Sequence, residues 1–211
     1  MIPSLHFVSW RTRLTRHAWR DDRAAQLVEF AVSLPLLVVF VVGIFDFSGA
    51  FTLKQKLTNI ARDAARAAAA DPSNDLAQSP TLPASVWDAL QLVQGNLMAN
   101  NIDQCGLNSA SYVNGPVANW KFTGTASSCP TGGLTVIINR GYYFPAGTLA
   151  QPANIQCQSP PPAGAQTEVV ATCVSIQYAY QWRFGRVASL LGSTSLLPTT
   201  INAIAVSMNE N

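Results

Sequence analysis

Charged residues and histidines are scarce in this 211-residue chain. Charged residues make up 11% of it, and its two histidines, His6 and His17, both lie near the N-terminus. Because no histidine follows His17, the rest of the chain cannot assemble a Ser-His-Asp or Cys-His arrangement for nucleophilic catalysis. The sequence also lacks a phosphate-binding glycine loop and a metal-ligand spacing. We therefore expect no catalytic residue, no metal site and no cofactor, and a protein that is not an enzyme.

Cysteine is absent before residue 105, and no two cysteines form a CxxC pair. A zinc ribbon or a thioredoxin-type motif is therefore not expected. An even number of cysteines in an exported domain favours two disulfides, and four cysteines allow three connectivities. Sequential pairing closes the shorter loops and is favoured over the other two connectivities and over four free thiols. The disulfide candidates are Cys105, Cys129, Cys157 and Cys173.

One long apolar run is present, from Ala24 to Phe45, and a single carboxylate, Glu29, interrupts it. Its 22 residues would form a helix of about 33 Å, enough to cross a hydrocarbon core of about 30 Å. An ionisable side chain inside such a segment is costly, so it normally has a partner or a function. We interpret the run as a transmembrane helix. The alternative to a paired Glu29 is a side chain that reaches the cytoplasmic interface without a partner.

The charges that flank this run set its expected orientation. Residues 1–23 carry five arginines and two aspartates, and by the positive-inside rule this segment stays in the cytoplasm. The chain after the helix is then exported, and its few basic residues give no nucleic-acid signal. A signal peptide cleaved after Ser48-Gly49-Ala50 is the alternative. It is disfavoured because the apolar run begins as early as Ala24 and helical sequence continues through that cleavage site.

Helical sequence continues over residues 51–70, which lack glycine and proline and are rich in alanine. The apolar residues recur at spacings of three and four, giving one stripe that can pack against other helices or against the chain's own head. Asp71-Pro72 should end the helix, and Pro35 should kink it. From Ala24 to Ala70 we expect one rod of roughly 70 Å. The stripe consists of Leu53, Leu57, Ile60 and Ala64.

The C-terminal part of the sequence has a mixed pattern. Ser85 to Asn100 has helical periodicity with Ser85 as the expected N-cap, and later segments alternate as strands do. Because helices precede strands, the fold class should be α+β, with a long N-terminal helix followed by a globular head that has a mainly antiparallel sheet. Strands are expected at 117–122, 134–144 with a break at Gly141, 167–182 and 199–208, a loop at 151–166, and a short helix at 183–191.

These elements give five expected parts. They are a basic cytoplasmic leader (1–23), a transmembrane helix (24–46), an extramembrane helical rod (47–70), a linker (71–83) and an exported α+β head (84–211). The aromatic residues of the head favour a role in its core or in an interface over a sugar-binding face. They are Tyr142, Tyr143, Phe144, Tyr178, Tyr180 and Trp182.

The N-terminal segment resembles the motif of the TadE-like family, minor pilin-like components of the tight-adherence (Flp-type) pilus machinery. That motif is roughly a glycine, three variable residues, VEFA, a proline, an apolar run and a G-I-x-[ED]-F step. The alanine- and arginine-rich residues 61–66 are similar to the family's continuation, and the match covers about 45 residues. The residues that carry the motif here are Val28, Glu29, Phe30, Pro35, Gly43, Asp46 and Phe47, with Ala24 at the glycine position.

The resemblance implies roles for several of these residues. In pilin-like proteins a prepilin-type peptidase removes the cytoplasmic leader just before the apolar helix, and here the cut would fall between Ala24 and Ala25. Since Ala24 stands where the family has glycine, cleavage and retention of the leader both stay open. The new α-amine of Ala25 would pair with Glu29 of a neighbouring subunit and set the stagger of adjacent helices. Asp46 would lie near the outer interface, where solvation is available.

The resemblance also implies a place and a role for the whole chain. It implies a non-enzymatic, single-pass protein of the bacterial inner membrane with a cytoplasmic N-terminus and a periplasmic head, retained there or incorporated in a surface pilus. Such a protein would prime, cap or decorate the tight-adherence pilus. Its partners would be membrane lipid, other pilin-like subunits, the assembly machinery and a prepilin-type peptidase, with no nucleic acid. The alternative function is a membrane-tethered adhesin that binds a surface glycan.

Overall fold

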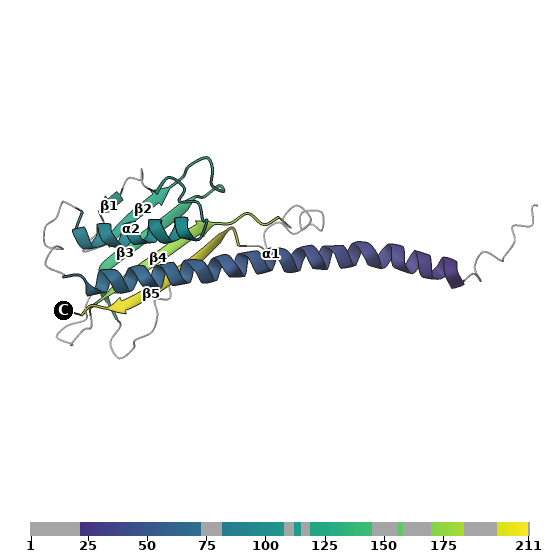
Figure 1. Ribbon diagram of the computed structural model, residues 1–211, viewed down its shortest axis with the longest axis horizontal. Coiled ribbons are helices and arrows are strands. Elements are labelled where there is room, and N and C mark those ends of the chain that lie inside the picture. The colour runs from purple at the N-terminus through teal and green to yellow at the C-terminus, as the bar shows by residue number, and fades with distance from the viewer. Residues whose placement is uncertain are drawn as a thin grey trace, which may run out of the picture. The chain divides into compact units, whose positions relative to one another are not determined.

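The computed structural model describes residues 22–72, 82–107, 112–114, 119–144, 156–157, 170–183 and 198–210 (Figure 1). The chain divides into two compact units, Met1–Ile44 and Phe45–Asn211. Residues 1–21 of the expected leader (1–23) and most of the expected linker lie outside the described residues. So do nearly all of the expected loop at 151–166 and of the expected helix at 183–191. Residues 22 and 23 of the expected leader belong to the first helix. The helices are α1 (Asp22–Ala70) and α2 (Ala84–Ala99), and the strands are β1 (Tyr112–Asn114), β2 (Asn119–Gly124), β3 (Leu134–Tyr143), β4 (Val170–Ala179) and β5 (Thr200–Met208).

The strands form one antiparallel sheet in the order β1-β2-β3-β4-β5. The predicted α+β class with a long N-terminal helix and an antiparallel sheet is therefore confirmed. β3 and β5 lie within one residue of the expected segments at both ends, and β2 begins and ends two residues later than expected. β1 was not expected, because three residues are too few to show the alternation by which strands are predicted.

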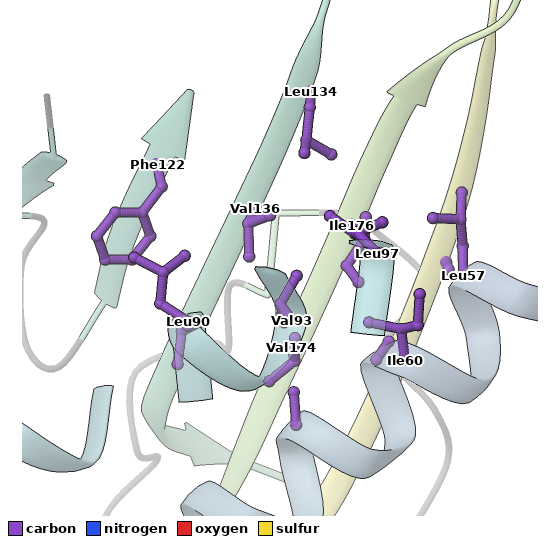
Figure 2. Packing of buried hydrophobic residues seen from close by; sticks show 14 of the residues in the cluster. Leu57, Ile60, Leu90, Val93, Leu97, Phe122, Leu134, Val136, Val174 and Ile176 are labelled. Carbon is purple, nitrogen blue, oxygen red and sulfur yellow. The ribbon is translucent and has the colours of Figure 1, made fainter. Parts of the chain in front are cut away.

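The main core lies between the two helices and one face of the sheet (Figure 1). Leu57 and Ile60 of α1 point toward the sheet, beside Leu90, Val93 and Leu97 of α2 (Figure 2). The apolar stripe on α1 therefore packs against the head of the same chain, which was one of the two packing partners expected for it. Alanines extend this contact along α1 and allow a close approach of helix and sheet, because they carry little side-chain volume. The buried alanines of α1 are Ala50, Ala61, Ala64, Ala65, Ala68 and Ala69.

A second, smaller cluster lies on the opposite face of the sheet. It joins Ile137 and Tyr142 of β3 to Ala171 and Cys173 of β4, and it includes Cys157. Asn139 holds the segment of Cys157 in place, because its side-chain amide donates to the Cys157 carbonyl at 2.7 Å. β3 and β4 are therefore buried on both faces, and their burial is nearly continuous along each strand.

The pairing of β3 with β4 shifts between Asn139 and Tyr142. An interruption at Gly141 was predicted from the sequence, and this irregularity confirms it. The Asn139 side-chain oxygen accepts the Gly141 amide at 2.9 Å, which compensates for ladder pairing lost at the bulge. The bulge also contains Arg140, which is fully buried.

The predicted N-cap of α2 is wrong. The cap is Pro83, and Ser85 lies inside the first turn, where it is buried. Proline serves here because its fixed φ suits the extended N-cap conformation, and its carbonyl accepts the amides of Val86 and Trp87 at 3.2 and 3.0 Å. A serine two residues later gave the wrong signal, since N-cap preference alone does not locate the first turn.

Candidate functional site

The first compact unit presents an apolar helix surface. Among the described residues, one helical stretch, Ala25–Ala70, is long and apolar enough to cross a membrane, judged by length and composition. Every side chain from residue 25 to residue 38 is exposed. Val39 is half-buried, and the large apolar side chains after it in this unit are exposed: Phe40, Val41, Val42 and Ile44. Exposing such a surface to water is unfavourable, whereas contact with lipid or with other apolar helices is favourable. This stretch of α1 fits a membrane-anchored protein.

Glu29 lies on this exposed stretch of α1. Its backbone carbonyl accepts the Ser33 hydroxyl at 2.7 Å, a bond within the helix that leaves the carboxylate free for other contacts. Within the described part of the chain, no side chain forms a hydrogen bond or ion pair with that carboxylate. Pro35 lies inside the same helix and cannot donate to the carbonyl of Ala31, four residues earlier. The peptide bond between Ala24 and Ala25 also lies within α1.

The second half of the family motif lies in the other compact unit and has a different environment. Asp46 is 6% exposed, and the Tyr180 hydroxyl donates to its carboxylate at 3.4 Å and to its backbone carbonyl at 3.3 Å. The resemblance implied a solvated Asp46, and the structure corrects this expectation. The residue is buried because Tyr180, just after β4, covers it.

Tyr180 and Trp182 continue β4 into an aromatic cluster on α1. The Trp182 ring lies 5.1 Å from that of Phe47 and 5.0 Å from that of Tyr180, measured between centroids. The Trp182 indole also donates to the Pro198 carbonyl at 2.6 Å, so its orientation is fixed from both sides. We call Phe47, Tyr180 and Trp182 the aromatic cluster.

The electrostatic environment of Tyr180 favours its neutral form. Burial raises the pKa of its phenol, and the negative charge and hydrogen bond of Asp46 raise this pKa further. Arg183 acts in the opposite direction and lowers it. The phenol is therefore a hydrogen-bond donor at neutral pH, as its contact with Asp46 requires.

Three cations tie α1 and α2 to the rest of the head. Arg140, in the bulge of β3, donates to the carbonyls of Asp71 at 2.7 Å and Pro72 at 3.3 Å, just past the C-terminus of α1. Lys56 of α1 donates to Asn100 at the C-terminus of α2, at 3.2 Å, and Lys54 donates to the carbonyl of Asn202 in β5. Cations are favoured at helix C-termini, where carbonyls lack intrahelical partners.

The cysteines pair in sequence order, Cys105 with Cys129 and Cys157 with Cys173. Asp103 lies near the first pair and accepts the Cys105 amide at 2.8 Å. Its carboxylate and the two sulfurs are close enough together to hold a metal ion, but sulfurs joined in a disulfide are not thiolate ligands. This group is therefore structural.

Sequence reasoning missed Arg140 and the partner of Asp46. An isolated arginine in a strand carries no pattern that predicts burial, and only its position next to Gly141 pointed to an irregularity. Tyr180 was noted among the aromatic residues of the head, but nothing in the sequence connects it to Asp46, 134 positions away. Both contacts arise from tertiary packing.

Most of α1 also matches a known protein family. Residues 24–66 match the sequence model of the family described as TadE-like protein. The match starts at Ala24, before the expected cleavage position, and ends at Arg66, in the part of α1 that packs against the sheet. No curated protein and no solved structure matches the chain. The family implies involvement in tight-adherence pilus assembly. The resemblance seen in the sequence is therefore confirmed for residues 24–66, which match the TadE-like family model.

Proposed function

We propose that this chain is a membrane-anchored, non-enzymatic pilin-like component of tight-adherence pilus biogenesis, which primes, caps or decorates the filament. The observation that carries the proposal is the exposed apolar stretch of α1 within the segment that matches the family. A lipid anchor alone would account for the apolar surface, but it does not require a carboxylate. Glu29 supports the further role in assembly.

The pairing of Glu29 with another subunit is supported by the size of the energies involved. An acidic side chain costs about 2.5–3.5 kcal/mol at the centre of a membrane helix on insertion scales, and less near the end of the helix, where Glu29 lies. Two opposite charges 4 Å apart attract by about 4 kcal/mol at an effective dielectric constant of 20. A cation on a neighbouring subunit would thus offset the cost. The α-amine of Ala25 is such a cation if a prepilin-type peptidase cuts after Ala24.

The same features support a location. Arginine-rich residues 1–23 favour a cytoplasmic N-terminus, and the head with two disulfides then lies in the oxidising periplasm of a bacterium, as a single-pass inner-membrane protein or as a subunit of a surface pilus. Lipid, other pilin-like subunits and the assembly machinery are the proposed partners.

A matched pair of substitutions tests the role of Glu29. Glu29→Leu should leave membrane insertion intact, as measured by flotation with membranes, and should abolish pili in electron micrographs. Gln26→Leu is the control, because it removes a polar side chain from the same end of the exposed stretch and should leave piliation unchanged. Normal piliation of the Glu29→Leu strain would refute the pairing role.

The state of the leader is tested by the intact mass of the protein recovered from membranes. Loss of residues 1–24 would show cleavage between Ala24 and Ala25, whereas a full-length mass would show an uncleaved anchor. Ala24→Gly restores the family residue and should increase cleavage if the alanine slows the peptidase. Loss of residues 1–50 would instead support a signal peptide and would contradict the proposed transmembrane anchor.

A further inference from the structure

The aromatic cluster lies where α1 leaves its apolar stretch. Asp46 and Phe47 follow that stretch directly in the chain, and both contact the residues after β4: Tyr180 donates to Asp46, and Trp182 packs on Phe47. These contacts place Tyr180 and Trp182 at the same level along α1 as residues 46 and 47. Where the membrane ends along α1 therefore decides where this part of the head lies.

The levels follow from helix geometry. A bilayer of about 40–45 Å with a hydrocarbon core of about 30 Å leaves about 5–7.5 Å of head-group layer on each side. If the core ends near residue 46, Phe47 lies about 1.5 Å and Phe51 about 7.5 Å beyond it along a helix that rises 1.5 Å per residue, so Phe51 reaches the outer edge of this layer. Both side chains are largely exposed, at 58% and 64%, although they belong to the compact unit of the head.

The chemistry of these residues suits that layer. Tryptophan and tyrosine are enriched at membrane interfaces because their rings are apolar and their polar atoms can still form hydrogen bonds. Arg183, next to Trp182, is exposed and can approach lipid phosphates. A carboxylate facing lipid at this level would be costly, and Tyr180 covers that of Asp46.

We propose that the aromatic cluster, with Phe51 and Arg183, is a lipid-binding surface that sits in the outer head-group layer and holds the head on the membrane. The proposal rests on the membrane anchoring proposed above. It goes beyond anchoring, because a transmembrane helix alone would leave the head free to stand away from the lipid.

The full chain reconstituted in vesicles of phosphatidylcholine and phosphatidylglycerol provides the test. Tryptophan emission is measured with and without lipids brominated near the head-group end of their acyl chains, which quench tryptophans at that depth. Trp10 and Trp19 are first replaced by phenylalanine, which leaves Trp87, Trp120 and Trp182. Trp120 is buried, and Trp87 is 43% exposed on α2, so Trp87 is the matched control for Trp182.

The proposal expects most of the quenching to disappear on Trp182→Phe and to remain on Trp87→Phe. Phe51→Trp, a change at an exposed position, should add quenched emission. Equal quenching in the two Trp→Phe variants would overturn the proposal. Emission from Trp182 that changes with protein density and not with brominated lipid would also overturn it, because a second copy of the chain would then cover the cluster. Flotation separates the two proposals: a chain that does not float with vesicles contradicts the anchor itself, whereas a floating chain with unquenched Trp182 contradicts only the lipid-binding surface.

Discussion

The Tyr180 hydroxyl donates to the carboxylate of Asp46 across 134 positions of sequence. Asp46 belongs to the Gly-Ile-x-Asp-Phe step of the family motif, and the sequence predicts that this step lies at the end of a membrane helix. In the structure this step is where the sheet of the head meets α1. The acidic residue thus contributes to docking the head on its own helix.

The contribution of this contact can be measured by Tyr180→Phe. The substitution removes the hydroxyl that donates to the Asp46 carboxylate and backbone carbonyl, while the ring and its packing on Trp182 stay, so the free energy of unfolding should fall by about 1 kcal/mol. Denaturant unfolding of the full chain in detergent micelles, followed by circular dichroism, provides the measurement. Tyr143→Phe, at a half-buried position on β3, is the control and should change stability by less than about 0.5 kcal/mol. Equal values for the two variants would show that the contact with Asp46 does not stabilise the fold.

The same tyrosine predicts a loss of stability at alkaline pH. Burial and Asp46 raise the pKa of Tyr180 above its usual value of 10.0, so folding favours the protonated phenol. This contribution is fully present below pH 10 and is lost as the pH rises through the higher pKa of the folded state. The free energy of unfolding should therefore decline above pH 10, and Tyr180→Phe should make the decline shallower. Burial also raises the pKa values of Tyr142 and Tyr178, so part of the decline should remain in that variant. An unchanged slope would contradict the prediction.

Arg140 should matter more for stability than its isolated place in the sequence suggests. Its guanidinium donates to the carbonyls of Asp71 and Pro72, and hydrogen bonds to a charged group are worth about 1.5–3 kcal/mol each. Arg140→Met keeps much of the side-chain volume and removes the donors, so it should destabilise the chain by about 3 kcal/mol. The stability of Arg140→Lys should lie between those of the unmodified chain and Arg140→Met, because one ammonium group cannot reproduce the planar fork of the guanidinium. Lys121→Met, at an exposed position on β2, is the control, and an Arg140→Met variant as stable as this control would contradict the prediction.

The parts of the fold that follow from local periodicity could be predicted from sequence. The stripe on residues 51–70, the helical repeat of α2 and the alternation of β5 each carry a period that identifies the element and its buried face. The bulge at Gly141 was also visible, because glycine in a strand marks such irregularities. Positions set by one residue's capping preference were less reliable, as Ser85 and Pro83 show.

The contacts that join distant segments could not be predicted in the same way. The stripe on α1 can pack against other helices or against its own head, depending on which apolar surface is closest after folding. Either surface would bury the same apolar side chains, so the sequence does not distinguish them. The burial of Asp46 depends on a tyrosine that only the course of β4 brings near. In the candidate site, the apolar run and the acidic Glu29 within it could be identified from the sequence. The contacts of Asp46 and Phe47 with the head could not.

The packing of α1 into the head gives a prediction about truncated chains. A chain that starts at Phe45 keeps the whole compact unit, whereas one that starts at Asp71 loses Leu57 and Ile60 from the core. Replacing even one buried side chain of this kind by alanine costs about 2–5 kcal/mol, so removal of the entire helix should exceed a typical stability of about 5–15 kcal/mol.

Both truncated chains can be exported behind the same cleavable signal, so that the disulfides have the same chance to form. The chain from Phe45 should show a cooperative thermal transition and resist limited proteolysis, and the chain from Asp71 should do neither. The family match ends at Arg66, inside the segment that separates the two chains, so the matched part of that segment would then be needed for the head to fold. A folded, protease-resistant chain from Asp71 would show instead that α1 only anchors the head and contributes no essential part of its core.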